Sequence, residues 1–503
     1  MTETFGFGPV SFTLYDILAL SPVLVLVITS LLILLTSVEG KKRCSPTSIS
    51  TVSILALLIS LEISIILWVW GSPSELWSGM LQLDNLALML NIIISAAALL
   101  TIFVSSTYEK AAKFPSAEYY FMLLNTSSGM MLMAMGTNLL MIFIALELFS
   151  ISLYVMVGLL REDRISTEAS LKYFFMGAFA TAFLFYGIAL VYGASGSLNL
   201  DSIYFAAKSA DTSQQLFFTI GFGLILVGFA FKIGLVPFHK WVPDVYEGAP
   251  TSVTAFMSVG TKAAAFAALL RVAIYAMQDI RKEAVYVIWI LAIATMLYGN
   301  ITALFQKNVK RLLAYSSIAQ AGYLLIPFVS ANHLSVSSVV FYLFVYCFAN
   351  IGAFGVVMVL GGKDDDDEHL DMKDYKGLGF KEPAIAMCMS IFLLSLAGFP
   401  PTAGFIGKFF LFASAVEDGF YFLASIGIMT SVISVFYYIR IIVNMYMHEE
   451  EKSIPKRRIS GLTKFFIILS ALIVLYLGII PSPLFNIAKQ TISSIFPDVP
   501  LYY

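Results

Sequence analysis

Four ionisable side chains interrupt long apolar stretches of the sequence. They are Glu147 in LLMIFIALELFSISLY, Lys232 in FAFKIGLVPFHKW, Lys262 in SVGTKAAAFAALL and Lys408 in SLAGFPPTAGFIGKFFLF. A charged group at the centre of a bilayer costs about 2.5–3.5 kcal/mol even on the most lenient insertion scale, so such groups mark functional sites by default. Carboxyl and amino groups can bind and release protons. These residue types at membrane depth therefore predict proton chemistry.

Each of these groups also has a purely structural explanation. Glu147 could be a protonated glutamate that makes one interhelical hydrogen bond. Lys262 could extend its stem toward the interface, but the nearer helix end is about eleven residues away, roughly 16 Å at 1.5 Å per residue. Lys232 and Lys408 could lie where a helix ends or kinks, with the charge reaching the interface.

Prolines lie close to two of the lysines. Pro237 follows Lys232, and Pro400 and Pro401 precede Lys408. A proline donates no hydrogen bond to the carbonyl four residues earlier. In lipid such carbonyls must find other partners, so broken helices line buried or watered cavities in which an ammonium can be solvated. The carbonyls that we expect to be freed in this way are those of Ile233, Leu396 and Ala397.

The elements that position these groups are predicted to be membrane-spanning helices. The chain has 503 residues, of which 59% are hydrophobic and 12% charged, against roughly 25% charged in soluble domains. About 20 apolar residues are needed to cross a bilayer. The sequence supplies fourteen such segments, approximately 14–37, 49–70, 84–106, 118–136, 137–157, 168–193, 213–240, 251–278, 284–305, 309–329, 334–360, 381–417, 419–447 and 462–482.

The distribution of Lys and Arg predicts the orientation. With both termini outside, 20 of the 30 lie in inside loops, four outside and six within helices. The first segment is too long for a signal-peptide apolar region and has no convincing cleavage site, so we expect a mature helix. The expected membrane is the inner (cytoplasmic) membrane or an energy-transducing equivalent.

The fourteen helices suggest an all-α fold with an internal repeat. Helices four to eight and nine to thirteen form two groups of five, and the fourth member of each contains the prolines. Because five is odd, a second copy would start from the opposite face, which is the inverted-repeat plan of many transporters. The predicted divisions are 1–117, 118–278, 279–448, and 449–503 with helix fourteen and the tail.

No cofactor site is evident in this chain. Cys44, Cys347 and Cys388 are far apart and have no zinc or iron–sulfur spacing. We find no phosphate-binding or dinucleotide-binding glycine motif. The acidic run Asp364 to Glu368 is most simply a solvated loop.

Several other charges have simpler explanations. Glu168 and Lys172 are four residues apart, as expected for a helix ion pair. Arg271 and Arg440 could pair or extend to the interface. Glu62, in LISLEISIILW, is central to the second helix and has no predicted role beyond an interhelical hydrogen bond.

Four long motifs resemble one known family. They are REDRISTEASLKYFFMGAFATAFLFYGIALVYG (161–193), FKIGLVPFHKWVPDVYEGAPTSVTAFMSVGTKAAAFA (231–267), KRLLAYSSIAQAGYLL (310–325) and LAGFPPTAGFIGKFFLF (396–412). Over residues 118–448 the chain resembles the N subunit of proton-pumping NADH:quinone oxidoreductase, respiratory complex I. PDVYEGAPT and a lysine, not a glutamate, in helix twelve favour the N type over the related L and M types.

The resemblance implies a role for each of the four charges. Glu147 matches the family's helix-five glutamate, Lys232 and Lys262 its helix-seven and helix-eight lysines, and Lys408 its helix-twelve lysine. In the family these form a chain of protonatable sites across the midplane. Gln320 lies where some members have histidine, so water or another group would relay the proton there. The candidate additional relay residues are Gln320, Lys172 and His239.

The resemblance also implies partners and cofactors. Other membrane-arm subunits of complex I, with M-type and K-type neighbours, and lipids are expected, and nucleic acid is not. Flavin, iron–sulfur clusters and quinone would belong to other subunits. Two alternatives stay open: a cation/proton antiporter subunit of the related sodium-extruding type, and a structural membrane-arm subunit whose charges no longer move protons.

Overall fold

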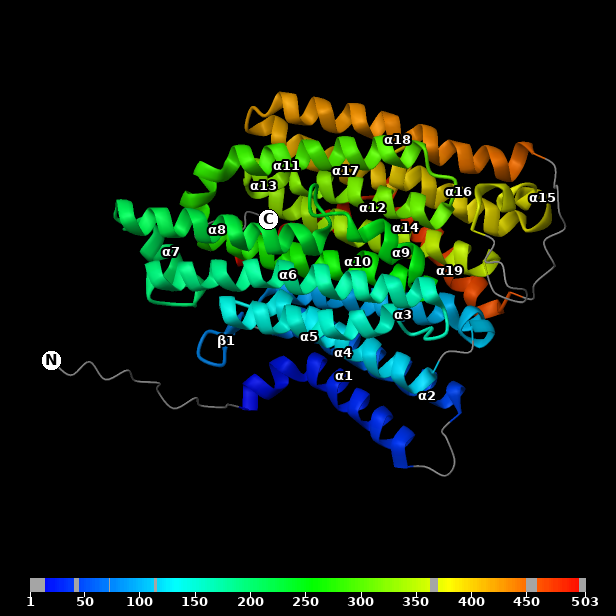
Figure 1. The fold of residues 1–503 in the computed structure, drawn as a ribbon, viewed down its shortest axis with the longest axis horizontal. Coiled ribbons are helices and arrows are strands. Elements are labelled where there is room, and N and C mark those ends of the chain that lie inside the picture. The colour runs from blue at the N-terminus through cyan, green and yellow to red at the C-terminus, as the bar shows by residue number, and fades with distance from the viewer. Residues whose placement is uncertain are drawn as a thin grey trace.

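The computed structural model describes residues 14–39, 45–71, 73–112, 115–361, 370–448 and 459–496. Long helices lie side by side in a bundle (Figure 1), and one short hairpin of β1 (Ser74–Leu76) and β2 (Leu81–Leu83) precedes the third long helix. The helices are α1 Leu14–Glu39, α2 Pro46–Trp70, α3 Asn85–Ala112, α4 Ser116–Met135, α5 Leu139–Val157, α6 Arg164–Ser195, α7 Leu200–Lys208, α8 Thr212–Ile233, α9 Trp241–Gly248, α10 Thr251–Leu269, η1 Leu270–Ala276, α11 Gln278–Leu304, α12 Val309–Leu325, α13 Pro327–Ser330, α14 His333–Leu360, η2 Met372–Tyr375, α15 Leu378–Lys381, α16 Pro383–Ala397, α17 Ala403–Glu417, α18 Tyr421–Met447, α19 Gly461–Ile479, α20 Ser482–Lys489 and η3 Ile492–Ser494.

The predicted all-α class is confirmed. Within the described ranges, twelve helices are long and apolar enough to cross a membrane. The other two predicted segments are also helical: one is α4, and the other is broken into α16 and α17. Each of the fourteen apolar stretches thus coincides with a helix or a broken pair of helices. The acidic run Asp364 to Glu368 and both chain termini lie outside the described residues.

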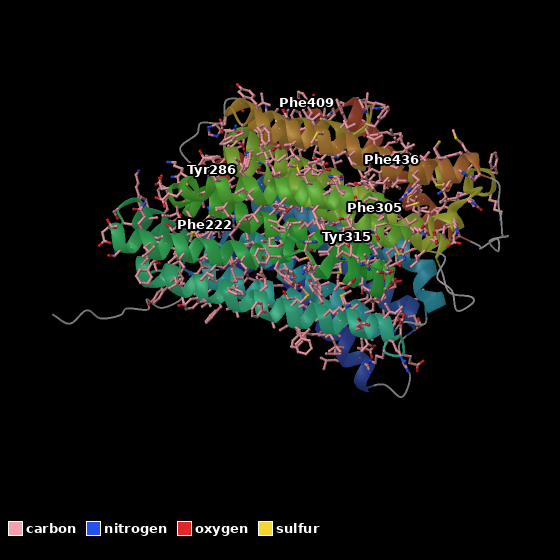
Figure 2. The ribbon with its side chains drawn as sticks, turned by 45° about the horizontal axis from the view of Figure 1, so that its top comes forward. Phe222, Tyr286, Phe305, Tyr315, Phe409 and Phe436 are labelled. Carbon is pink, nitrogen blue, oxygen red and sulfur yellow. The ribbon has the colours of Figure 1, made fainter. Side chains whose placement is uncertain are left out.

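The helices form a buried centre and an exposed periphery. In the apolar stretches of the spans 251–276 and 309–330 all residues are buried, and in that of α14 94% are. In the apolar stretches of α2 and α6 only 28% and 33% of the residues are buried. Large aromatic side chains on peripheral helices, such as Phe305, Phe409 and Phe436, are 57–76% exposed (Figure 2). Because lipid is as apolar as these side chains, the exposed surface suits a membrane.

Two of the helices are broken, as the prolines predicted. The helix α8 ends at Ile233 and α9 begins at Trp241; α16 ends at Ala397 and α17 begins at Ala403. Each first half ends at a glycine in the left-handed conformation, Gly234 with φ 84° and Gly398 with φ 82°, which favours glycine because it has no Cβ. The cis bonds Val236–Pro237 and Pro400–Pro401 lie within the breaks. The helices thus end three or four residues before the prolines, and each is followed by its capping glycine.

The broken pairs occupy equivalent places in the two predicted groups. The pair α8–α9 is the fourth member of a group that begins at α4, and the pair α16–α17 is the fourth member of a group that begins at α11. The inverted relation between the groups and the four domain boundaries stay predictions.

The second break depends on a close contact at Gly404. A Cβ added there would lie 1.8 Å from the carbonyl oxygen of Ser395, and the Gly404 amide donates to the Ser395 hydroxyl at 3.1 Å. We therefore expect Gly404→Ala to lower the free energy of unfolding by about 1–3 kcal/mol, as overpacking does. Thermal unfolding in detergent measures the change.

The matched control is Gly193→Ala in α6. A Cβ at Gly193 would meet nothing within 4 Å, so alanine should be neutral or stabilise the helix by about 0.5–1 kcal/mol. Equal stability of the Gly404 and Gly193 variants would contradict the proposed contact.

Candidate functional site

Lys232 lies in the last turn of α8 and is only 2% exposed. Its Nζ donates to the hydroxyl of Ser150 at 2.7 Å and to that of Tyr173 at 3.4 Å. The ring centroids of Phe149, Tyr154 and Tyr173 lie 4.8–5.7 Å from Nζ, within the range at which aromatic faces attract a cation. The ammonium is thus held by hydroxyls and rings of α5 and α6.

The partners of Lys232 are side-chain hydroxyls and not the backbone of the first break. Pro237 was expected to free the carbonyl of Ile233, next to Lys232, but the partners of the lysine are the hydroxyls of Ser150 and Tyr173. The carbonyl of Phe231 accepts the indole N–H of Trp241 at 2.9 Å. The side chains that satisfy this region therefore come from neighbouring elements and from the second half-helix.

Glu147 is half-buried on α5, and its Oε1 accepts a hydrogen bond from the Thr181 hydroxyl at 2.8 Å. Within the described residues it makes no direct ion pair with Lys232. A cavity of about 10 Å³ is lined by Thr181 and Lys232, among others. That volume is near the lower limit for one water molecule, and most of the residues that line the cavity are apolar.

Lys262 lies in the middle of α10, all of whose residues are buried. Its Nζ donates to both the carbonyl and the hydroxyl of Ser317 on α12. The Tyr346 hydroxyl also donates to the Ser317 hydroxyl at 3.0 Å, and the Tyr346 ring centroid is 5.3 Å from Nζ. At 2% exposure, this lysine cannot reach an interface, which excludes the snorkelling explanation.

Gln320 lies one helical turn after Ser317 on α12 and connects it to the second break. Its Nε2 donates to the freed carbonyl of Leu396 at 2.9 Å, and its Oε1 accepts from the Tyr342 hydroxyl. The same Nε2 lies 3.5 Å from the Tyr438 hydroxyl. Two phenols therefore flank the glutamine, although an amide itself does not titrate.

Lys408 lies on α17 just after the second break and is 2% exposed. Its Nζ donates to the carbonyl of Ala397 at 3.1 Å and to the Ser431 hydroxyl at 3.0 Å. The Tyr323 ring centroid is 4.5 Å away. The expectation that this break supplies carbonyls to a buried ammonium is confirmed at Ala397.

Lys232 and Lys262 are connected by packed rings. Tyr173, which contacts Lys232, stacks on Trp241 with centroids 4.5 Å apart, and Trp241 meets the Tyr246 ring edge-on at 6.3 Å. The Tyr246 hydroxyl lies 3.5 Å from the Ser317 hydroxyl, beside Lys262. The second half-helix thus spans the space between the two lysines, but no continuous hydrogen-bond chain does so among the described residues.

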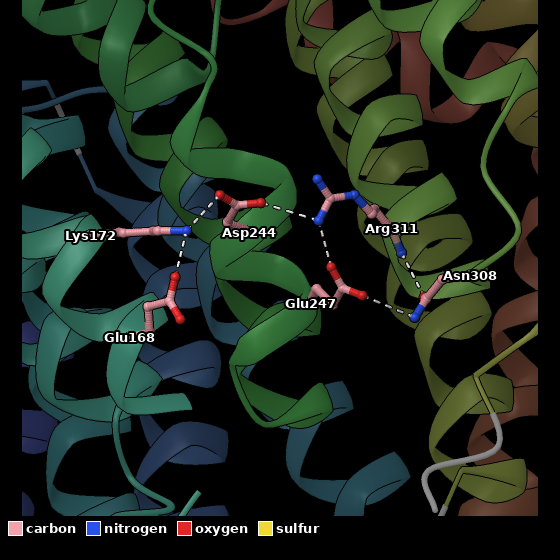
Figure 3. A network of polar contacts seen from close by, with 6 residues as sticks. All are labelled: Glu168, Lys172, Asp244, Glu247, Asn308 and Arg311. Atoms are coloured by element: carbon pink, nitrogen blue, oxygen red, sulfur yellow. Dashed lines mark hydrogen bonds and ion pairs between the residues drawn. The ribbon is translucent and has the colours of Figure 1, made fainter. Parts of the chain in front are cut away.

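A charged network lies at the ends of α6, α9 and α12 that are predicted to face inside (Figure 3). Lys172 pairs with Glu168 at 2.8 Å, which confirms the predicted i, i+4 pair, and with Asp244 at 3.1 Å. Arg311 bridges Asp244 at 3.1 Å and Glu247. A cavity of about 760 Å³, lined in part by Glu247, opens nearby.

The other relay candidates are placed differently. Lys172 is 44% exposed within this network and is not in contact with Lys232. His239, in the first break, is 5% exposed and packs edge-on against Tyr298 with centroids 4.4 Å apart. Its Nδ1 makes no hydrogen bond within the described structure.

Sequence reasoning missed the hydroxyl residues around the four charges and around Gln320. The missed residues are Ser150, Tyr173, Thr181, Ser317, Tyr342, Tyr346, Tyr438 and Ser431. Short hydroxyls are common in apolar helices and often bond to their own backbone. Ser150, Tyr173, Thr181 and Ser317 lie inside sequence stretches described above, but nothing in those stretches distinguishes them from the other hydroxyl residues there.

Known proteins with similar sequences indicate the family of this chain. Residues 136–434 match the family described as NADH:quinone oxidoreductase/Mrp antiporter, TM. The chain is 45% identical to NADH-quinone oxidoreductase subunit N of Trichlorobacter lovleyi over 426 residues, which are 85% of this chain and 87% of that protein.

Two solved structures have the same fold. A chain of respiratory complex I from Thermus thermophilus with bound aureothin is 31% identical, with a TM-score of 0.78 over 93% of this chain and 99% of that one. A chain of the Mrp complex from Dietzia sp. DQ12-45-1b is 21% identical, with a TM-score of 0.83 over 97% and 98%. The second likeness concerns the fold alone.

Proposed function

We propose that this chain, which belongs to the NADH-quinone oxidoreductase subunit N family, moves protons through its buried charges as a membrane-arm subunit of such an oxidoreductase. The observation that carries the proposal is the set of three lysines, each 2% exposed. Each ammonium is held by hydroxyls or carbonyls and has no carboxylate within ion-pair distance in the described structure. A buried ammonium without a counter-ion is poised to release its proton.

The first step is electrostatic coupling between Glu147 and Lys232. Two unit charges about 8 Å apart at an effective dielectric of about 20 interact by about 2 kcal/mol. A charged Glu147 favours the protonated form of Lys232, and neutralising Glu147 favours proton release. The carboxyl accepts a hydrogen bond from Thr181 and makes no direct ion pair with the ammonium in the described structure, so the coupling can be changed without breaking a tight pair.

The later steps run along α12. Lys262 contacts Ser317, and Gln320 on the same helix bonds to Leu396, next to the Ala397 carbonyl that holds Lys408. Because Gln320 does not titrate, we assign the relay to hydroxyls of Tyr342 and Tyr438 and to water. The direction is from Lys232 through Lys262 to Lys408 and out.

The remaining parts of the proposal concern the assembly. We place the redox cofactors in other subunits, because Cys347 and Cys388 are buried, free and distant in sequence. The chain is a multi-pass subunit of an energy-transducing membrane with both termini outside, and its neighbours are the M-type and K-type subunits. The charged network around Asp244 then faces the side from which protons are taken up.

Replacement of Glu147 or Lys232 tests the first step. Glu147→Gln and Lys232→Ala should leave the complex assembled. Each should reduce proton translocation and the coupled quinone reductase rate by about 10²-fold or more, because the loss of a proton-transfer group has an effect of that size. Proton uptake into inverted vesicles and the subunit composition of the purified complex are the measurements. Full pumping by either variant in an assembled complex would favour the structural role instead.

A further inference from the structure

Glu62 is an acidic side chain that the proton route does not use. It lies on α2, eight residues before Trp70, the last residue of that helix, and so roughly 12 Å from the nearer helix end at 1.5 Å per residue. Its side chain is exposed, and among the described residues no ion pair or hydrogen bond includes its carboxyl. A glutamate side chain is too short to carry the charge from this depth to the interface.

The exposed face of α2 around Glu62 is largely aliphatic. Its exposed side chains include a series that is 46–64% exposed and, with Glu62, recurs at intervals of three and four residues along one face of the helix: Val52, Leu55, Ile59, Ile66 and Val69. The opposite face of α2 carries Ser53, Ser60 and Ser64, which are buried. We call the exposed series the α2 outer seam.

The neighbouring helix α1 provides an internal comparison. Over residues 14–36 its exposed positions, such as Ile28 and Leu31, are uncharged, as lipid contact requires. The α2 outer seam instead places a carboxyl at its centre. Ionisable residues within membranes almost always face protein or water and pair with another group. A lipid-facing seam would therefore leave Glu62 without the partner that its position requires.

We propose that the α2 outer seam docks a membrane-spanning helix of another subunit, and that this helix presents a lysine or arginine to Glu62. The proposal rests on the assembly of this chain into a membrane complex and goes beyond the proton route. Charge complementarity selects the cation. A second copy of this chain is disfavoured, because a symmetric contact in the membrane would bring Glu62 against Glu62.

Photo-crosslinking in native membranes tests the seam without altering Glu62. A benzophenone amino acid is placed at Ile59 or Ile66, and in the control at Leu31 on α1. We expect protein adducts from the two seam positions, mapped by mass spectrometry to a helix with a basic residue, and lipid adducts from Leu31. Lipid adducts alone from the seam, an adduct with a second copy, or a partner helix without lysine or arginine would overturn the proposal.

Substitution of Glu62 tests the charge. Glu62→Leu should reduce recovery of the cross-linked subunit with this chain by at least about tenfold, the effect of 1.4 kcal/mol, because the partner's cation would be left unpaired. The control variant is Glu162→Leu, at an exposed loop residue, which should leave the recovery of the cross-linked subunit unchanged. Unchanged recovery of the partner with Glu62→Leu would contradict the ion pair.

The seam and the proton route can fail separately. Lys262→Met should retain the photo-adduct from Ile59 if the seam is a docking surface, whatever its effect on pumping. If Lys262→Met pumped normally while the seam adduct persisted, the proposed function would fail and the docking surface would stand.

Discussion

Lys262→Met should leave the chain folded and assembled but reduce proton translocation by about 10²-fold or more, because it removes the one titratable group on α10 that contacts α12. Methionine keeps a flexible unbranched side chain of similar length. Every residue of α10 is buried, so the loss cannot be explained by a changed surface. The measurement is the ratio of protons taken up to NADH oxidised in sealed inverted vesicles.

The control makes the same chemical change elsewhere. Lys208 ends α7 and is exposed, with its Nζ 5.9 Å from the Tyr204 ring centroid. Lys208→Met should therefore pump as the unaltered protein does. If Lys262→Met pumped at the same rate as Lys208→Met, the α10–α12 contact would not be part of the proton route.

The membrane architecture was predictable because lipid leaves few choices. Each run of about 20 apolar residues had to be a helix, since a helix satisfies its own backbone groups, and all fourteen runs are helical. The breaks were predictable from Pro237 and Pro400–Pro401. Their positions were not, because the chain leaves the helix at Gly234 and Gly398, and a glycine within an apolar run gives only a weak local signal.

The four charges were predictable individually, but their surroundings were not. Lys232 binds a hydroxyl 82 positions away in sequence, and Lys262 binds a serine 55 positions away. Such partners are set by which helices pack together, and single-sequence patterns do not contain that information. The freed carbonyl of Ala397 is the exception: its release follows from local backbone chemistry, so the sequence alone indicated it.

Arg271 shows the same limit. From the sequence it could pair or extend to the interface, and the structure pairs it with Asp84, 187 residues earlier. Two parallel bonds of 2.8 Å join the groups, which are 2% and 3% exposed, and the Arg271 Nε donates to the Ala134 carbonyl at 3.0 Å. This pair connects the start of α3 and the end of α4 to η1, directly after the helix that carries Lys262.

Asp84→Asn should therefore lower the free energy of unfolding by about 3–5 kcal/mol, because it leaves the Arg271 guanidinium buried without a counter-ion. The Asp84 carboxyl caps α3 by accepting a hydrogen bond from the Ala87 amide at 2.8 Å, and asparagine can still do so. The loss of stability would therefore result from the missing charge and not from a missing cap. Chemical denaturation in detergent, followed by circular dichroism, gives the difference. The exposed pair Asp279–Lys282 provides the control, since Asp279→Asn should cost about 0–1 kcal/mol.

The double variant Asp84→Asn with Arg271→Met separates the ion pair from other effects of either change. Removing both charges leaves neither group buried and unpaired, so the double variant should be more stable than the sum of the two single losses predicts, by about 0.5–3 kcal/mol. Strict additivity would mean that the bonds between Asp84 and Arg271 do not couple α3 to η1. Asp84 and Arg271 lie outside the chain of contacts from Lys232 to Lys408. If the coupling is present, Asp84→Asn should therefore lower pumping only because less of the protein is folded, and pumping per folded complex should be unchanged.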